Sequence, residues 1–173
     1  MIKNRVSIEE RPEIVDQKSR IGDWEGDTVI GKNHRGALVT LAERKSRYVL
    51  AAQVPGKHAK GVTAAVTRLL RPHKRKCHTV TFDNRKEFVE HETIAAKLDA
   101  DIYFAHPYHS WERGLNENSN GLLRQYFPKG MELTEVTQEQ VQSAVDARPL
   151  LTRALARLAG RIAGLCGEAN RAV

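Results

Sequence analysis

Three strand-like stretches in quick succession constrain the fold of this chain more than any other feature. They span about residues 23–31, 36–44 and 47–54, and the turns between them are short. Because short turns connect antiparallel neighbours, these stretches predict a three-strand meander. The chain has 173 residues, which is long enough for one domain with a continuous core.

Helices and strands alternate after the meander. Apolar residues at helical spacing predict helices, and short apolar runs between them predict two more strands. The expected helices cover about residues 59–72, 87–100, 111–125 and 134–147, and the expected strands cover 78–83 and 100–105. This order predicts an α/β fold with a five-stranded mixed sheet, in which two parallel strands join the antiparallel meander and helices flank the sheet. On such sheets, ligands gather at the carboxyl ends of adjacent central strands.

The chain is basic, with a formal net charge of +7 at pH 7. A cationic surface favours polyanionic partners such as nucleic acids. Cys77 and Cys166 are far apart and belong to no CxxC pair, which indicates a reducing compartment. No apolar stretch is long enough to span a bilayer, so we expect a soluble, cytoplasmic protein.

Three acidic residues lie where this fold can bring them together. Asp27 lies within the first strand, Asp83 ends the strand in "TFDNRKEF", and Glu117 lies on the helix in "SWERGLNENSNGLLRQYF". Oxygen ligands select Mg²⁺ or Mn²⁺, and two such ions about 3.5–4 Å apart form the clamp used in phosphoryl transfer. Taken singly, each residue is more typical of a surface or helix-capping position, because a chain with 21 acidic residues must place most of them outside. Spacing alone therefore leaves both interpretations open.

The segments "GDWEGDTVIG", "TFDNRKEF" and "YFAHPYHSWERGLNENSNGLLRQYFPKG" resemble the catalytic domain of bacterial transposases of the insertion-sequence thirty family. That family lies within the superfamily of DDE transposases and retroviral-type integrases, and the resemblance extends from about Ile8 to Ala147. It implies a ribonuclease H-like fold and a catalytic triad of Asp27, Asp83 and Glu117 that holds two Mg²⁺ or Mn²⁺ ions. The 33 residues between Asp83 and Glu117 match the spacing that the resemblance implies.

The resemblance also implies a reaction. The family cleaves a DNA strand at the ends of an insertion sequence and then activates the freed 3′-hydroxyl to attack target DNA. The implied roles are DNA integration, DNA recombination and transposition, with DNA as the partner, a homo-oligomer as the active form and no membrane. Two alternatives stay open: a non-catalytic DNA-binding or inhibitory transposase remnant, and a ribonuclease H-like nuclease that acts on RNA–DNA hybrids or junctions.

Basic residues near these motifs are candidates for contacts with DNA. The run "RPHKRKCH" is typical either of a solvated loop or of a patch that contacts phosphates. Two arginines flank Glu117, and two lysines lie in the matching motif segments. The candidate DNA-binding residues are Lys74, Arg75, Lys76, Lys86, Arg113, Arg124 and Lys129. Trp24 and Trp111 are more typical of core or packing residues than of base-stacking platforms.

The histidines raise a zinc hypothesis that the sequence does not favour. Cys77 and His78 are adjacent, and the "HPYH" pair formed by His106 and His109 has no second matching pair. We therefore expect His106 and His109 to shape the loop before the Glu117 helix, close to the DNA or the active site.

Arg85 departs from the family pattern, which usually has Asp-Asn-Gly where this chain has Asp-Asn-Arg. If this turn needs a positive φ, a residue with a side chain costs roughly 1–2 kcal/mol there. The guanidinium also brings positive charge close to a cation site. We expect Arg85 to impair activity, and an outward side chain that contacts a phosphate is the alternative.

The chain divides into three parts by composition and resemblance. Residues 1–20 are interpreted as a linker or arm from an N-terminal DNA-binding region that the resemblance implies and this chain lacks. Residues 21–147 are interpreted as the integrase-type catalytic core. Residues 148–173 form a divergent tail rich in Ala, Leu, Arg and Gly, which fits translation in a shifted reading frame, and we expect its structure to be poorly specified.

Overall fold

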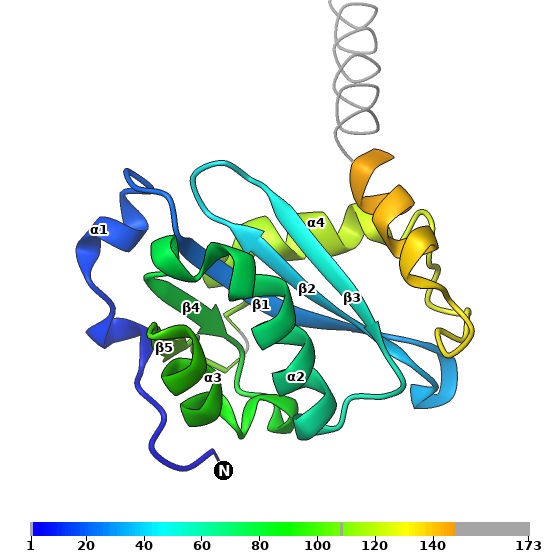
Figure 1. The fold of residues 1–173 in the computed structure, drawn as a ribbon, viewed down its shortest axis with the longest axis horizontal. Coiled ribbons are helices and arrows are strands. Elements are labelled where there is room, and N and C mark those ends of the chain that lie inside the picture. Colours follow the sequence, from blue (N-terminus) through cyan, green and yellow to red (C-terminus); the bar gives the residue numbers. More distant parts are fainter. Residues whose placement is uncertain (1, 108, 148–173) are drawn as a thin grey trace, which may run out of the picture.

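A five-stranded mixed sheet forms the centre of the molecule (Figure 1). A computed structural model describes residues 2–107 and 109–147, without the side chains of Ser110 and Trp111. The tail expected at 148–173 lies outside the described residues. The strands are β1 (Asp23–Ile30), β2 (Ala37–Glu43), β3 (Val49–Val54), β4 (Thr79–Phe82) and β5 (Asp101–Phe104), in the spatial order β3-β2-β1-β4-β5.

The pairing of the strands confirms the predicted topology. β1 pairs with β2 and β2 pairs with β3, both antiparallel, whereas β1 pairs with β4 and β4 pairs with β5 in parallel. β1 is therefore the central strand, with the meander on one side and the parallel strands on the other. Its carboxyl end and that of β4 lie at the same edge of the sheet.

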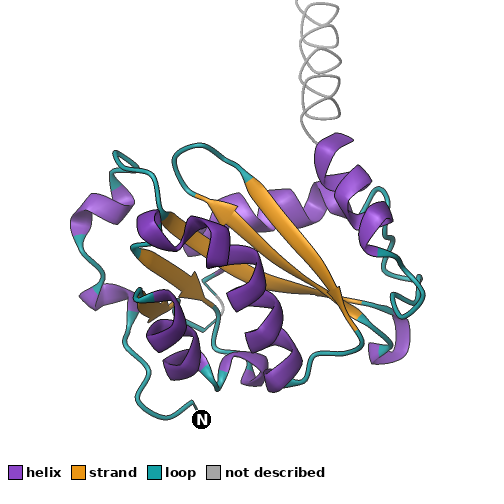
Figure 2. Cartoon of the chain, in the orientation of Figure 1, coloured by secondary structure: helices purple, strands orange, loops and turns teal. Residues whose placement is uncertain are grey.

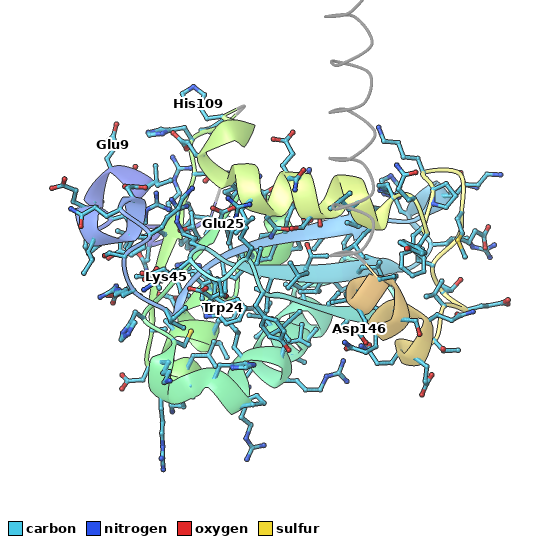
Figure 3. The ribbon with its side chains drawn as sticks, turned by 90° about the horizontal axis from the view of Figure 1, so that it is seen from above. Glu9, Trp24, Glu25, Lys45, His109 and Asp146 are labelled. Carbon is cyan, nitrogen blue, oxygen red and sulfur yellow. The ribbon has the colours of Figure 1, made fainter. Side chains whose placement is uncertain are left out.

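Helices cover both faces of the sheet (Figures 1 and 2). α2 (Ala59–Leu70) and α3 (His91–Leu98) lie on one face, and α4 (Gly114–Leu123) lies on the other. Each face has its own apolar core. The first core includes Trp24, Phe82 and Phe88, and the second includes Leu123, Phe127 and Leu133. The three-layer order is visible in Figure 3, which views the sheet from above.

Short helical turns supplement these elements. They are η1 (Ile8–Glu10), α1 (Glu13–Asp16), η2 (Lys32–His34), η3 (Arg71–Lys76), η4 (Lys86–Phe88) and η5 (Ser110–Arg113), and residues 138–147 are also helical. The helix predicted from residue 87 begins only at 91, because η4 turns Phe88 inward. There the Phe88 ring stacks on Phe82 with a centroid distance of 4.2 Å.

The segment predicted as an arm lies along the edge strand β5. The backbone N–H of Phe104 donates to the carbonyl of Val6, and Ser7 forms a parallel bridge with Phe104. Ile2 and Val15 are buried. The arm thus covers an edge that would otherwise expose unpaired backbone groups.

The helices of the described part of the chain are too short or too polar to cross a membrane.

Candidate active site

The register of the parallel strands places Asp27 beside Asp83. Glu25 of β1 is paired with Thr81 of β4. Two residues further along each strand lie Asp27 and Asp83, whose side chains are only 13% and 14% exposed. The sequence allows this close packing because a Cβ on Gly26 would lie 2.3 Å from the ring of Phe82. The two carboxylates therefore lie side by side, with Asp83 directly after the end of β4 and Asp27 within β1, three residues before its end.

Two guanidinium groups bridge these carboxylates. Arg85 Nε lies 2.9 Å from Asp83 Oδ2, and Arg85 Nη1 lies 3.3 Å from Asp27 Oδ1. Arg113 Nη1 lies 3.3 Å from Asp27 Oδ2, and Arg113 Nη2 lies 3.7 Å from Asp83 Oδ2. Two carboxylates repel each other in a poorly hydrated site. The positive charges of Arg85 and Arg113 reduce this repulsion and allow the close approach.

The electrostatics of Asp83 differ from those of an ordinary surface carboxylate. Burial and then the neighbouring charge of Asp27 raise the pKa of Asp83 to about 6. Arg85 and Arg113 lower this pKa, as does the backbone N–H of Arg85, but they do not offset the first two effects. A further positive charge near the two aspartates would therefore stabilise the ionised form of Asp83. Carboxylates with a strongly shifted pKa are typical of functional sites.

Arg85 occupies its turn without the expected strain. Its backbone has φ −79° and ψ 149°, an extended conformation that any residue adopts. The turn therefore does not need a positive φ at Arg85. The backbone strain expected at this position was a wrong prediction. Its side chain points inward to the carboxylates, and 48% of that side chain is still exposed.

Asparagines on α4 dock this helix onto the sheet. Asn116 is fully buried, and its Nδ2 donates to the carbonyls of Glu25 and Thr40 at 2.8 and 3.2 Å. Its backbone N–H donates to Glu25 Oε2 at 2.9 Å. One turn further along, Asn120 Nδ2 donates to Asp27 Oδ2 at 3.2 Å. Neither residue was given a role from the sequence, although their i, i+4 spacing and poor fit to a helix interior were a signal for tertiary hydrogen bonds.

Glu117 lies in the first turn of α4 and is exposed. Residues three apart share a helix face, so Glu117 lies on the side of α4 from which Asn120 reaches Asp27. Its carboxylate is not gathered tightly with the other two. Over the residues that the structure describes, the group of three potential metal ligands within 4.8 Å is a different one, formed by His106, His109 and Glu112.

The chemistry of the site fits a hard divalent cation. The donors gathered here are the carboxylates of Asp27 and Asp83, together with Asn120 Oδ1, which is buried and has no hydrogen-bond partner. All of these donors are oxygens, the ligand type that Mg²⁺ and Mn²⁺ prefer.

The candidate DNA-binding residues separate into two groups. Arg113 is buried against the carboxylates, and Arg124 is half-buried and donates to the carbonyl of Ile30 at 2.9 Å. Both guanidiniums are thus engaged within the protein. The exposed candidates are Lys74, Arg75, Lys76, Lys86 and Lys129. Trp24 is buried in the core, as expected, while the side chain of Trp111 lies outside the described part.

Comparison with known proteins gives this chain clear relatives. Residues 17–110 match the family model of the integrase core domain, a range that includes Asp27 and Asp83. The transposase for insertion sequence element IS4351 of Bacteroides fragilis is 52% identical over 141 residues, covering 82% of this chain and 43% of that protein. Transposase InsI for insertion sequence element IS30A of Escherichia coli (strain K12) is 36% identical over 155 residues, covering 87% of this chain and 40% of that protein. The chain spans less than half the length of these curated relatives.

Solved structures with the same fold also match. One belongs to the cryo-EM structure of the simian T-cell lymphotropic virus intasome in complex with PP2A regulatory subunit B56 gamma, with a TM-score of 0.59 and 19% identity. That match covers 74% of this chain and 48% of the other. The catalytic core domain of BIV integrase matches with a TM-score of 0.50 and 21% identity over 60% of this chain and 67% of the other.

Proposed function

We propose that this chain, which belongs to the integrase core domain family and has a ribonuclease H-like fold, is the catalytic domain of an insertion-sequence transposase. Its reaction is cleavage of a DNA strand at the element's ends and transfer of the 3′ end to target DNA. The observation that carries this proposal is the pair of carboxylates, Asp27 within β1 and Asp83 directly after the parallel strand β4. Relatives named as transposases support the same assignment.

The proposal gives the three acidic residues one role, which the side-by-side position of Asp27 and Asp83 supports. Asp27, Asp83 and Glu117 hold Mg²⁺ or Mn²⁺, with two ions in the active complex. When bound, these ions would activate the attacking water or 3′-hydroxyl and neutralise the charge that develops on the phosphate. Asn120 orients the carboxylate of Asp27 through its 3.2 Å hydrogen bond.

The two arginines have different roles in this proposal. Arg113 has a buried side chain and contacts both aspartates, so it keeps the carboxylates side by side. Arg85 contacts the same two carboxylates from a position that is half exposed, so it can leave them. A cation held by Asp27 and Asp83 would compete with Arg85 for these carboxylates, whereas the buried side chain of Arg113 would stay in place.

DNA is the proposed partner, and a homo-oligomer is the proposed active form. The exposed lysines and arginine of the candidate set supply phosphate contacts, in keeping with the net charge of +7. We place the protein in the cytoplasm, on DNA when it is active. Residues 21–147 are the proposed catalytic core, with 1–20 as its N-terminal arm and 148–173 as a divergent tail.

A non-catalytic remnant is the second candidate function. The specific observation in its favour is Arg85, whose guanidinium lies where a cation would contact Asp83 and Asp27. A chain of this kind binds DNA or an intact transposase without cutting.

Nicking of DNA distinguishes these functions. The substrate is a labelled duplex taken from the DNA that flanks the coding sequence, with Mg²⁺ or Mn²⁺ added or withheld. Nicking should depend on the metal and fall about 100-fold or more in Asp27→Asn, Asp83→Asn and Glu117→Gln. Asp146→Asn is the control, because Asp146 is exposed on the helix at 138–147, far along the chain from the triad.

The other outcomes identify the alternatives. Preferred cleavage of an RNA–DNA hybrid supports a ribonuclease H-like nuclease. DNA binding without cleavage, both in this chain and in Arg85→Gly, supports the remnant and contradicts the proposed catalytic function.

A further inference from the structure

The connection between β5 and α4 holds a cluster of three potential metal ligands outside the carboxylate site. His106 and His109 lie in the loop after β5, and Glu112 lies in η5. One ligand atom from each residue lies within 4.8 Å of the others. Figure 3 shows His109 above the start of α4, with Glu9 on the neighbouring turn of the N-terminal arm.

The two imidazole rings point at the same carboxylate oxygen. His106 Nδ1 lies 2.8 Å from Glu112 Oε1, and His109 Nδ1 lies 3.3 Å from that oxygen. The rings are tilted by 56° with centroids 5.3 Å apart, so they converge on the oxygen and do not stack on each other. Two nitrogens and one carboxylate oxygen form the ligand set that zinc and neighbouring first-row divalent ions take.

Other contacts hold these ligands in place. The backbone N–H of His106 donates to Glu112 Oε2 at 2.8 Å, which fixes the carboxylate through its second oxygen. On the far side of the ring, His106 Nε2 lies 3.3 Å from Glu9 Oε1. A carboxylate on the outer nitrogen of a histidine is the usual partner of a metal-ligating imidazole, because it fixes the ring orientation and the tautomer.

A histidine–glutamate hydrogen bond that merely shapes the loop explains only part of this geometry. It accounts for His106 and Glu112, but it needs neither a second imidazole on the same oxygen nor a carboxylate behind the first ring. The nearby positive charges do not oppose a cation either. Arg11 and Arg44 line the same pocket, where Arg11 is paired with Asp16 and Arg44 is paired with Glu25 at 2.7 Å and with Asp16 at 3.3 Å.

We infer that His106, His109 and Glu112 form a second metal site, which takes Zn²⁺ or a similar first-row divalent ion. Glu9 positions His106, and the fourth coordination position is open to water. This site differs in ligand type from the oxygen-only donors around Asp27. The sequence pattern did not favour a zinc site, because the third ligand is a glutamate in place of a second matching pair and the orienting carboxylate comes from the N-terminal arm.

The site has a structural consequence for the carboxylate pair. Arg113 follows Glu112 directly in the chain and contacts both Asp27 and Asp83. An ion on Glu112 therefore fixes the segment that places Arg113 and begins α4.

Zinc binding to the full chain, purified without a histidine tag, tests this inference. Calorimetric titration with Zn²⁺ in excess Mg²⁺, which occupies the oxygen-only donors, should give one site per chain, and Co²⁺ should give the visible absorption of a nitrogen- and oxygen-ligated ion. His109→Ala and Glu112→Gln should weaken Zn²⁺ binding at least 10-fold. Glu9→Gln should weaken it about 10-fold, because loss of an orienting carboxylate typically costs 10–100-fold in metal affinity.

Two controls separate this site from other sources of binding. His58→Ala removes an exposed histidine that caps α2 without a side-chain hydrogen bond, and it should leave the affinity unchanged. Asp83→Asn removes a ligand of the other site, so any Zn²⁺ that this variant loses and His109→Ala keeps is assigned to the carboxylate pair. Circular dichroism without metal verifies that each variant is folded. If Glu112→Gln does not fold, His109→Ala alone decides the test.

Zn²⁺ that binds equally well to His109→Ala and the unaltered chain overturns the inference. So does the absence of binding at Zn²⁺ concentrations up to about 1 mM, which corresponds to a binding free energy weaker than about −4 kcal/mol. Either result leaves the proposed transposase function intact, because that function does not use this site.

Discussion

At the carboxylate pair, Arg85 takes part of the role that a divalent cation has in the proposed active complex. Its guanidinium contacts one oxygen of Asp83 and one of Asp27. A bound cation and this guanidinium compete for the same charges, so the energy of the arginine contacts is subtracted from the affinity for metal. Arg85 therefore stabilises the two carboxylates without metal and lowers their affinity for a metal ion.

Arg85→Gly should strengthen Mn²⁺ or Mg²⁺ binding by up to about 5-fold, because the contacts that it removes contribute about 0–1 kcal/mol and each factor of ten requires about 1.4 kcal/mol. The melting temperature should change by only a few degrees, because an ion pair with a half-exposed partner contributes about 0–1 kcal/mol. Calorimetry or electron paramagnetic resonance with Mn²⁺ measures the affinity. Arg35→Gly is the matched control, since Arg35 is an exposed arginine paired with Glu132. Weaker metal binding in Arg85→Gly would refute the competition.

Asp83 provides a second test, in the dependence of stability on pH. Its pKa in the fold is about 6, above the value of 3.8 of an unperturbed aspartate. Between these pH values the folded state binds more protons than the unfolded state, so stability falls as the pH rises through this range. The destabilising contribution is complete above pH 6 and is lost as the pH falls to about 3.8.

Asp83→Asn should therefore raise the free energy of unfolding by about 1–2 kcal/mol at pH 7.5, since one pKa unit is about 1.4 kcal/mol and the raised pKa already includes the contacts with Arg85 and Arg113. The gain should be nearly absent at pH 4. Urea denaturation in the presence of a chelator measures both, and Asp146→Asn should show no such difference. Destabilisation by Asp83→Asn at pH 7.5 would mean that the contacts with Arg85 and Arg113 outweigh the cost of burial.

Among the elements, α4 carries most of the geometry of the site. Asn116 satisfies backbone carbonyls of β1 and β2, and it also accepts from Thr40 Oγ1 at 3.0 Å. Asn116→Ala leaves these buried groups without partners, and each such group costs about 1–3 kcal/mol. We expect a loss of about 2–4 kcal/mol in the free energy of unfolding, measured by urea denaturation.

The matched control is Asn118→Ala on the same helix. Asn118 is exposed, so its replacement should change stability by about 0.5 kcal/mol or less. Equal effects of the two substitutions would show that α4 is not docked through Asn116.

The elements also show how far the sequence could predict this structure. The strands were predicted well because alternation and short turns are local signals, and the register that follows from them places Asp27 beside Asp83. Arg113 was predicted to contact DNA, since a charge near a motif carries no local sign of burial. Its inward position depends on how α4 packs against β1, which no pattern within the helix records.

For the whole molecule, the distribution of exposed positive charge distinguishes two ends of the sheet. Lys86 follows Asp83 by three residues, in η4. Lys129 lies in the connection after α4, where the carbonyl of Met131 accepts from the backbone N–H of Lys32, just beyond β1. Lys74 and Lys76 lie in η3, which leads into the beginning of β4 and thus lies at the other end of that strand from Asp83.

DNA whose scissile phosphate lies at the carboxylate pair is therefore expected to contact Lys86 and Lys129 more than Lys74 and Lys76. Each phosphate contact changes the slope of log affinity against log salt concentration by about 0.9. Lys86→Ala with Lys129→Ala should reduce that slope by about 1–2, measured by fluorescence anisotropy with a short labelled duplex. Lys74→Ala with Lys76→Ala removes the same charge and serves as the matched control, so it should reduce the slope by about 0.5 or less. A larger effect of the Lys74 and Lys76 substitutions would place the DNA path along η3, away from the carboxylates. Bound phosphates would then lie far from the groups that cleave them, which would favour a binding remnant over a cutting enzyme.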